Sequence, residues 1–572
     1  METESVGTLQ RRRSTCDPTD SLAYDEKVRN IQALSLETDE ILRQEAIRDA
    51  TPSPEEVELI DPMCDPSNPR KIQFADISAA AYNIRGGVAV TPCTKSGQLS
   101  KLLGMELYFK KEFLQATGSF KERGARYALL KLTEEEKRRG VIAASAGNHA
   151  LALCYHGQSL QIPVTVVMPV IAPLMKISLC RSYGATIILH GDNLFAAKQQ
   201  AMKLAVENKM RYINGYDHPD ILAGQGTVGL EILDQVENVD AIIVPIGGGG
   251  LIAGIATAVK TLKPDVSVIG VEAETCPSFR SAVEAGHAVG TTWGGGGEDS
   301  CLAVPVVGSN ALVTANELVD ELVSVSEESV ALAILRLIEM EKAIVEGAGA
   351  VGLAALLQRK LSNLKGKRVV VVLSGGNIDT TVLGRAIERG LAADSRLVQF
   401  DVVVSDRPGG IAELAALLTH QGASIKDIFH ERAWVTTDVF SVKVKVVAET
   451  RDREHASTLE NALRAHYKDN ITFHRRAQVE AASEPSIQGE FHLQVKLALN
   501  RHVPEERRSS NDAESGMYCD PRDFCEKNIN EYLFNNTPIN LKLSIFDIQS
   551  ISKKNSGKMT IFIVNLPNAL LI

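Results

Sequence analysis

The sequence has no apolar run long enough to cross a membrane, because none reaches the roughly 20 residues that a spanning helix needs. It also has no excess of positive charge, since its formal net charge at pH 7 is -10. A nucleic-acid partner would require a dominant basic surface. We therefore expect neither a membrane partner nor a nucleic-acid partner.

Cysteine pairs are missing as well. The nine cysteines are scattered, with no CxxC pair and no His/Cys spacing typical of a metal site. This pattern indicates no disulfide framework and favours a reducing compartment. Arg11, Arg12 and Arg13 are basic, but no apolar segment follows them, so we expect no secretory signal. The cytoplasm is the expected location, and a mitochondrial transit peptide is the open alternative.

Aromatic residues are scarce, at 5%, whereas apolar residues make up 44% of the chain and glycine is common. Small apolar residues suit buried parallel strands and close helix packing. The 572 residues are enough for two to four domains.

Residues 1–70 are expected to form a disordered extension outside the main fold. The stretch 49–70 contains five prolines among acidic residues, which predicts a linker without regular structure. One helix is expected between Tyr24 and Arg48, where apolar residues recur at helical spacing.

Residues 71–393 alternate short apolar runs with helical patterns, which predicts an α/β fold with parallel sheets. About 320 residues exceed one ordinary core, so we expect two lobes with the site in the cleft between them. Helices are expected near 195–209 and 251–262. The predicted strands are 107–109, 141–144, 164–167, 186–189, 241–244, 268–271 and 369–372.

Residues 396–474 have a different pattern, which predicts a small βαββαβ domain. Strands are expected at 398–405, 425–432 and 440–447, and helices at 411–421 and 455–467. The short run 471–473 is the candidate for the fourth strand. Residues 475–572 form a tail with no assigned structure.

A run of four glycines follows the strand that ends at Ile246 and precedes a helical pattern. Glycine turns let backbone N–H groups approach an anion, and a helix N-terminus adds positive potential. The run therefore predicts a phosphate site rather than a plain tight turn, although the Walker pattern is absent. The residues of this site are Gly247, Gly248, Gly249 and Gly250. A second run, 294–297, follows no strand and is expected to be a loop.

Lys121 follows Gly-Ser-Phe and, taken alone, reads as a surface lysine at a helix start. A lysine can also form a Schiff base and act as a base when its pKa is lowered. Ser374 ends the strand 369–373, where a neutral hydroxyl could face a cofactor ring nitrogen. The turn 145–150 can present N–H groups to a substrate carboxylate.

Together these segments resemble the fold-type II pyridoxal-phosphate enzymes, specifically the threonine dehydratases, whose fold is like that of the tryptophan synthase beta chain. The motifs that carry the resemblance are 117–125, 145–150, 245–254, 346–350 and 373–379. The resemblance implies a threonine ammonia-lyase that also acts on serine, in amino-acid catabolism or isoleucine biosynthesis. A dimer or tetramer is also implied.

The resemblance assigns roles to individual residues. Lys121 is the catalytic Schiff-base lysine of pyridoxal 5′-phosphate, Phe120 packs beside the cofactor, and Ser374 faces its ring nitrogen. Asn148 meets the cofactor's 3′-oxygen, and the glycine run holds its phosphate. The substrate-binding residues implied are Ser145, Ala146, Gly147, Asn148 and His149. Residues 396–474 resemble an ACT domain, which implies control by an amino acid or a nucleotide, with isoleucine and AMP as candidates.

Three alternatives stay open. A serine racemase has the same fold, but racemisation needs an acid where this chain has Ala146. A cysteine-synthase-type enzyme would have other motifs around its lysine. The third alternative is an amino-acid sensor without catalytic activity, and the presence of all the named catalytic residues counts against it.

Some relatives bind a cation. Glu272 could be one ligand, but the position of a second acid is Ser278, so no metal site is predicted.

Overall fold

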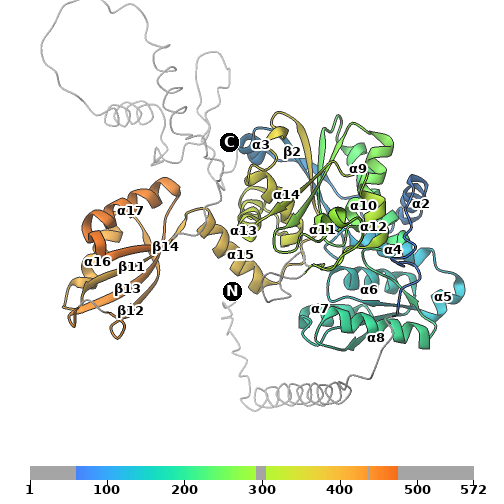
Figure 1. Ribbon diagram of the computed structural model, residues 1–572, viewed down its shortest axis with the longest axis horizontal. Coiled ribbons are helices and arrows are strands. Elements are labelled where there is room, and N and C mark those ends of the chain that lie inside the picture. The colour runs from blue at the N-terminus through green and yellow to red at the C-terminus, as the bar shows by residue number, and fades with distance from the viewer. Residues whose placement is uncertain (1–58, 292–303, 436–437, 475–572) are drawn as a thin grey trace, which may run out of the picture. The chain divides into compact units, whose positions relative to one another are not determined.

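The computed structural model describes residues 59–291, 304–435 and 438–474 (Figure 1). The helix expected between Tyr24 and Arg48, the glycine loop 294–297 and the tail 475–572 lie outside the described residues. Among the residues that are described, no helix combines the length and the apolar character needed to span a bilayer.

Within these ranges the larger sheet of the catalytic domain has six strands. Their order is β1 (Cys93–Lys95), β2 (Glu106–Lys111), β10 (Arg368–Leu373), β7 (Ala241–Pro245), β8 (Ser267–Ala273) and β9 (Glu321–Val325). Neighbouring strands are parallel, except that β1 runs antiparallel to β2. The central strands are runs of valine and isoleucine because both of their faces are covered by other elements.

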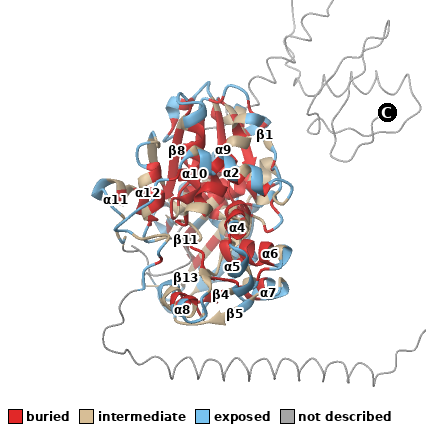
Figure 2. Cartoon of the chain, turned by 90° about the vertical axis from the view of Figure 1, so that its right-hand side faces the viewer, coloured by how far each residue is buried: buried red, intermediate tan, exposed pale blue. Residues whose placement is uncertain are grey.

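Strand β10 shows how the core is divided between the two faces of this sheet. Val369, Val371 and Leu373 belong to one apolar cluster, whereas Val370 and Val372 belong to another. Successive side chains of a strand point to opposite faces, so a continuous apolar run is needed to fill both. Figure 2 shows this buried layer in red around β8, α9 and α10.

The smaller sheet has four strands in the described residues, all parallel. Their order is β5 (Thr186–Leu189), β4 (Val164–Met168), β3 (Val141–Ala144) and β6 (Arg211–Tyr212). It forms the core of the second lobe, and the two sheets confirm the predicted two-lobed α/β fold with parallel strands.

Helices connect and cover these strands (Figure 1). Those nearest the candidate site are α4 (Lys121–Leu130), α6 (Asn148–Leu160), α9 (Pro219–Gln235), α10 (Gly250–Leu262), α12 (Ser309–Ala315) and α14 (Gly347–Leu357). The others are α2 (Phe74–Ile84), α3 (Gly97–Leu103), α5 (Glu134–Arg139), α7 (Leu174–Ser182), α8 (Leu194–Glu207), α11 (Ser278–Ala285), α13 (Glu327–Arg336) and α15 (Thr380–Ala393). Short helical turns are η1 (Glu112–Leu114), η2 (Leu337–Glu341), η3 (Ser362–Leu364) and η4 (Lys468–Asn470).

The seven strands predicted for the catalytic region are all confirmed, as are the two predicted helices. The structure adds β1, β6 and β9, which the sequence pattern did not indicate. Strand β6 has only two residues, and β9 mixes Glu321 and Ser324 with its apolar residues. Such short or mixed runs fall below the length at which a strand pattern is distinctive.

Residues after 396 form a separate antiparallel sheet with two helices. The elements are β11 (Leu397–Ser405), α16 (Gly410–His420), β12 (Ser424–Glu431), β13 (Ser441–Glu449), α17 (Arg453–Tyr467) and β14 (Ile471–His474). The strand order is β12-β13-β11-β14, and the pairs are antiparallel. Phe400, Val444 and Leu459 are part of its apolar core. The predicted βαββαβ order, with its short fourth strand, is therefore present.

The last part of the expected linker packs on the catalytic domain. The amide group of Asn310, in α12, donates from Nδ2 to the carbonyl oxygen of Met63 over 2.8 Å. Its Oδ1 accepts the backbone N–H of Arg70 over 2.6 Å. Residues 59–70 have no helix or strand, as predicted. They are nevertheless hydrogen-bonded to the domain that was expected to begin only at residue 71.

Candidate active site

Lys121 is the first residue of α4, and the turn before it is held by the end of β10. The N–H of Phe120 donates to the carbonyl oxygen of Ser374 over 3.0 Å, and Ser119 forms an isolated bridge with Gly375. Gly118 has φ +76, and a Cβ there would lie 2.4 Å from Oδ1 of Asn377, so only glycine fits this turn. The sequence therefore places a lysine beside the carboxyl end of a central parallel strand.

The amine of Lys121 is tied to the segment that precedes α9. Nζ donates to the carbonyl oxygen of Gly215 over 2.6 Å, and it lies 5.1 Å from the ring centre of Phe120. Burial lowers the pKa of Lys121 to about 8, and the negative charge of Glu346 acts in the opposite direction. A substantial fraction of this amine is therefore neutral near physiological pH, as a base or nucleophile requires.

The four-glycine run joins β7 to α10 in a turn that has no room for side chains. A Cβ on Gly248 would lie 2.3 Å from the ring of Tyr216, and one on Gly250 would lie 2.4 Å from the carbonyl oxygen of the same tyrosine. Gly249 has φ +90. Among the described residues, no acceptor meets the backbone N–H groups of Gly247 to Gly250. Free N–H groups at a helix start are the donors that an anion needs.

The predicted substrate turn lies between β3 and α6. Ser145 Oγ accepts the N–H of Gly147 over 3.3 Å, and Asn148 opens the helix. Asn148 Nδ2 donates to Oε1 of Glu346 over 2.8 Å, and its Oδ1 accepts Nδ2 of Asn377 over 2.8 Å. An amide nitrogen has two hydrogens, so Asn148 keeps one donor for a further partner.

His149 is buried and faces away from solvent. Its Nε2 donates to the carbonyl oxygen of Ile213 over 3.0 Å, and its ring would be 2.6 Å from a Cβ on Gly215. Burial, helped by the charge of Lys121, lowers the pKa of His149 to about 3. The neutral ring therefore supports the segment that carries Gly215, and its Nδ1 has no partner among the described residues.

The structure brings most of the predicted site residues into one connected set. Lys121 contacts Gly215, the next residue Tyr216 packs on the glycine run, and Phe120 is bonded to Ser374. Asn148 joins the set through Glu346, which also approaches Gly375. Ala146 is partly buried and packs beside the apolar core of the smaller lobe. Their individual roles stay predictions.

Four residues at this site had no assigned role in the sequence: Gly215, Tyr216, Glu346 and Asn377. Glu346 and Asn377 lie inside motifs that the family resemblance rests on, so their position in those motifs was a usable signal. Gly215 and Tyr216 lie in a polar turn with no distinctive pattern. Only the packing of this turn on the glycine run reveals them.

Glu272 lies on β8, beside the start of α11. Its Oε2 accepts the N–H of Phe279 over 3.1 Å, and burial raises the pKa of Glu272 to about 7. Ser278 is buried nearby, at the first position of α11. No group of three or more metal-binding side chains occurs in the ranges that the structure covers.

Comparisons with known proteins agree with this geometry. The family model described as "Pyridoxal-phosphate dependent enzyme" matches residues 84–375. An L-threonine ammonia-lyase of Thermotoga maritima is 40% identical over 392 residues, which cover 68% of this chain and 97% of the relative. An L-threonine ammonia-lyase of Geobacter sulfurreducens is 42% identical over 384 residues, covering 67% of this chain and 95% of the relative.

Solved structures show the same fold. The processed form of threonine deaminase isoform 2 from Solanum lycopersicum has a TM-score of 0.53 and 32% identity, covering 59% of this chain and 98% of that one. Serine racemase from Dictyostelium discoideum has a TM-score of 0.51 and 34% identity, covering 54% and 99%. The family match spans half of the chain, and the curated relatives align over nearly their full length. This chain therefore belongs to the family of pyridoxal-phosphate dependent enzymes.

Proposed function

We propose that the chain is an L-threonine ammonia-lyase, or threonine dehydratase, that also acts on L-serine. The reaction eliminates water from the substrate, and hydrolysis of the released enamine then consumes a water molecule and frees ammonia, giving 2-oxobutanoate from threonine or pyruvate from serine. The observation that carries the proposal is the amine of Lys121, which donates to the carbonyl oxygen of Gly215, follows a turn bonded to Ser374 and has a lowered pKa. The two threonine ammonia-lyases at 40% and 42% identity support this choice of reaction.

The residues present fit pyridoxal 5′-phosphate. The unbonded N–H groups of the glycine run, at the start of α10, would hold its phosphate. Lys121 would hold its aldehyde carbon, and the second N–H of Asn148 would reach its 3′-oxygen. Ser374 would present a neutral hydroxyl to its ring nitrogen. When bound, the cofactor supplies an electron sink for the bonds at the substrate Cα.

The chain's own groups then act on the substrate. Neutral Lys121 Nζ would accept the proton of the substrate Cα, since a base with a pKa of about 8 is effective near neutral pH. Backbone N–H groups of the turn 145–149 would bind the substrate carboxylate, with Ser145 Oγ holding the turn through Gly147. Glu346 fixes the side chain of Asn148 and sets the charge around Lys121.

Serine racemisation is the competing reaction, because serine racemases have similar structures. It needs a proton donor on the face of the substrate opposite Lys121. In this chain Ala146 stands where the racemases have a serine, and a methyl group donates no proton. We therefore favour elimination over racemisation. D-serine formed from L-serine as fast as pyruvate would contradict this choice.

Further features belong to the same proposal. Residues 396–474 would act as an ACT-like regulatory domain for an amino acid or nucleotide. The alignments with the bacterial relatives are longer than residues 84–375, which supports a shared second domain. A homo-oligomer, either a dimer or a tetramer, and a cytoplasmic location are also proposed.

The test is steady-state release of 2-oxo acid by the purified protein saturated with cofactor. L-threonine and L-serine are supplied separately, with and without isoleucine or AMP. We expect 2-oxobutanoate and pyruvate respectively, and a change of rate with one effector. A protein that binds the cofactor but releases neither product would contradict the proposed reaction.

A further inference from the structure

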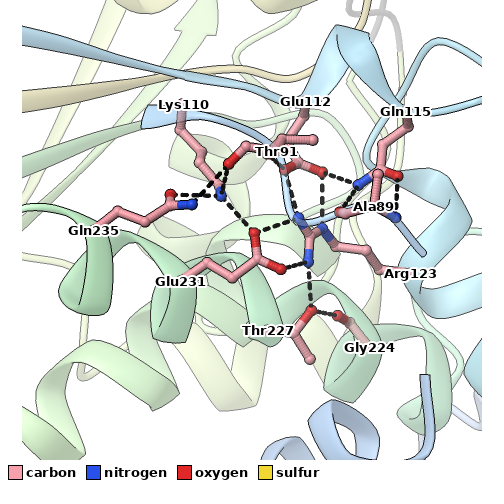
Figure 3. Close-up of polar contacts among 10 residues, drawn as sticks. All are labelled: Ala89, Thr91, Lys110, Glu112, Gln115, Arg123, Gly224, Thr227, Glu231 and Gln235. Atoms are coloured by element: carbon pink, nitrogen blue, oxygen red, sulfur yellow. Dashed lines mark hydrogen bonds and ion pairs between the residues drawn. The ribbon is translucent and has the colours of Figure 1, made fainter. Parts of the chain in front are cut away.

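Four charged side chains, three of them buried and one partly buried, lie beside the helix that begins with Lys121 (Figure 3). They are Lys110 of β2, Glu112 of η1, Arg123 of α4 and Glu231 of α9, and we call them the charge cluster. The side chains of Lys110, Glu112 and Arg123 are at most 1% exposed, and that of Glu231 is 19% exposed. Two cations and two carboxylates balance in number, as a buried set of charges requires.

Arg123 is the centre of the charge cluster. Its Nε and Nη2 donate to Glu112 over 2.8 and 2.7 Å, and its Nη1 and Nη2 donate to Glu231 over 2.6 and 2.8 Å. The remaining donor reaches Oγ1 of Thr227 over 3.1 Å. All five N–H donors of the guanidinium are therefore used, two at each carboxylate.

Lys110 ties the cluster to the larger sheet. Its Nζ donates to Glu231, to the carbonyl oxygen of Thr91 over 2.7 Å and to Oε1 of Gln235 over 2.9 Å. Strand β2 and helices α4 and α9 are thus joined at one point, although the contacting residues are up to 125 positions apart in the sequence.

The same two helices, α4 and α9, also meet through glycines. A Cβ on Gly224 would lie 2.5 Å from the Cα of Gly124, so the two backbones touch where the helices cross. Arg123 is next to this crossing, and Glu231 lies two turns further along α9. The crossing at the two glycines fixes the point at which α4 and α9 touch. The hydrogen bonds from Arg123 to Glu231 then limit how far α4 can slide or rotate against α9.

These helices begin at the candidate active site. Lys121 opens α4, and Gly215 and Tyr216 lie just before α9. The Nζ of Lys121 is bonded to the carbonyl oxygen of Gly215, and Tyr216 packs on the phosphate-binding glycines. A shift of α4 against α9 would therefore move the amine relative to both groups.

We propose that Arg123 and Glu231 are positioning residues, which hold the amine of Lys121 in its position relative to Gly215 and the glycine run. This inference rests on the proposed role of Lys121. None of the four charged groups contacts the cofactor or the substrate in this assignment. They act through the relative placement of α4, α9 and β2.

The geometry explains why position 123 is an arginine. A planar guanidinium can donate to two carboxylates at once, whereas a lysine ammonium is a point charge with three donors. Arg123→Lys keeps the charge but loses the double two-pronged contact. The Arg123→Lys variant should therefore fail to hold α4 in its place against α9, although the charges of the cluster still balance.

The test compares Glu231→Gln and Arg123→Lys with the wild-type holoenzyme. Ile232→Ala is the matched control, because Ile232 lies next to Glu231 on α9, is fully buried and has no part in the charge cluster. Glu231→Gln keeps the shape of the side chain, so it remains informative if Arg123→Lys does not fold. Melting temperature, kcat, KM for threonine and the cofactor's absorbance band and affinity are measured for each.

We expect Glu231→Gln and Arg123→Lys to lower kcat about tenfold or more, because small displacements of a reacting group have large effects on rate. KM should change less than about threefold, since the substrate turn 145–149 lies on other elements. The absorbance band of the bound cofactor should weaken or shift, and its affinity should fall. Ile232→Ala should lose comparable melting temperature while its kcat stays within about twofold of wild type.

Equal effects of Glu231→Gln and Ile232→Ala on kcat and on cofactor affinity, at equal loss of melting temperature, would overturn the inference. The cluster would then only stabilise the fold. A wild-type protein that binds no cofactor would instead overturn the proposed function, and the inference with it. Normal wild-type activity with unaffected cluster variants would contradict the inference alone.

Discussion

Asn148 donates from Nδ2 to Oε1 of Glu346 over 2.8 Å, although the two residues are 198 positions apart in the chain. Asn148 opens α6 of the smaller lobe, and Glu346 precedes α14 beside the larger sheet. This bond joins the two lobes at the candidate active site. Burial raises the pKa of Glu346, whereas its bond to Asn148 and the charge of Lys121 act in the opposite direction.

Glu346→Gln should shift the pH dependence of kcat to lower pH. The Glu346 charge raises the pKa of Lys121 against the larger effect of burial, so its removal should bring that pKa below about 8. In the proposed function the neutral amine of Lys121 is the base, so the acid limb of the kcat profile should shift to lower pH together with the pKa of Lys121. Glutamine can still accept the bond from Asn148. A profile that stays in place or moves to higher pH would contradict this account.

Lys121→Ala should abolish 2-oxo acid formation and the absorbance band of the bound cofactor. Loss of a base and nucleophile should lower kcat by about a thousandfold or more. Lys131→Ala is the control, because Lys131 is an exposed residue that follows the same helix. Its activity should match wild type. An unchanged absorbance band in Lys121→Ala would show that another amine holds the cofactor.

Gly248→Ala should weaken cofactor binding. Its new methyl group would meet the ring of Tyr216 at 2.3 Å, so either the glycine turn or Tyr216 must move. The dissociation constant, measured by cofactor fluorescence, should rise about tenfold or more, because a displaced turn loses N–H contacts to the phosphate. Gly384→Ala in α15, where nothing lies within 4 Å, is the control. Equal cofactor affinity of the two variants would argue against phosphate binding at this turn.

The sequence was sufficient to predict elements whose residues follow a simple local pattern. The valine run of β10 and the glycines after β7 are examples, because burial on both faces and a sharp turn each require particular residue types. The order of elements in the C-terminal sheet was predicted for the same reason. The glycine run and Lys121 could be assigned to one site because the run follows the predicted strand β7 and Lys121 begins a predicted helix.

Contacts between distant segments were not predictable in this way. Glu231 lies 108 positions after Arg123, and neither residue is part of a pattern that indicates a partner. Residues 59–70 read as a linker because their prolines exclude regular structure, and local sequence does not show the amide of Asn310 that holds them. Such contacts depend on the folded arrangement of the whole domain.

Asp217→Asn should make stability less dependent on pH. Burial raises the pKa of Asp217 from 3.8 to about 7, against the bonds it accepts from the start of α12. The folded protein therefore binds more protons than the unfolded chain between pH 3.8 and about 7, and stability falls as pH rises through this range. Removing the carboxylate should raise stability near pH 8, relative to wild type, by up to about 4 kcal/mol.

The measurement is the melting temperature of Asp217→Asn and wild type at several values of pH between 4 and 8. The difference between them should grow in favour of the variant as pH rises. Asp265→Asn, at an exposed position, is the control and should track wild type. A constant difference across the range would show that Asp217 ionises with an ordinary pKa.

Asn310→Ala should release residues 59–70 from the catalytic domain. The Asn310 amide is fully buried, donates to the carbonyl oxygens of Met63 and Asp217 over 2.8 and 2.9 Å, and accepts the N–H of Arg70. Its removal leaves those groups without partners, which should lower the free energy of unfolding by about 1–3 kcal/mol.

Limited proteolysis gives the direct measurement, since cleavage between residues 59 and 70 should become faster in Asn310→Ala than in wild type. Asn316→Ala, at an exposed position just after the same helix, should be cleaved at the wild-type rate. Because Gly308, at the start of α12, donates its N–H to the carbonyl oxygen of Gly248, cofactor affinity should also fall in Asn310→Ala. Unchanged cleavage and unchanged affinity would mean that these hydrogen bonds do not hold the segment in place.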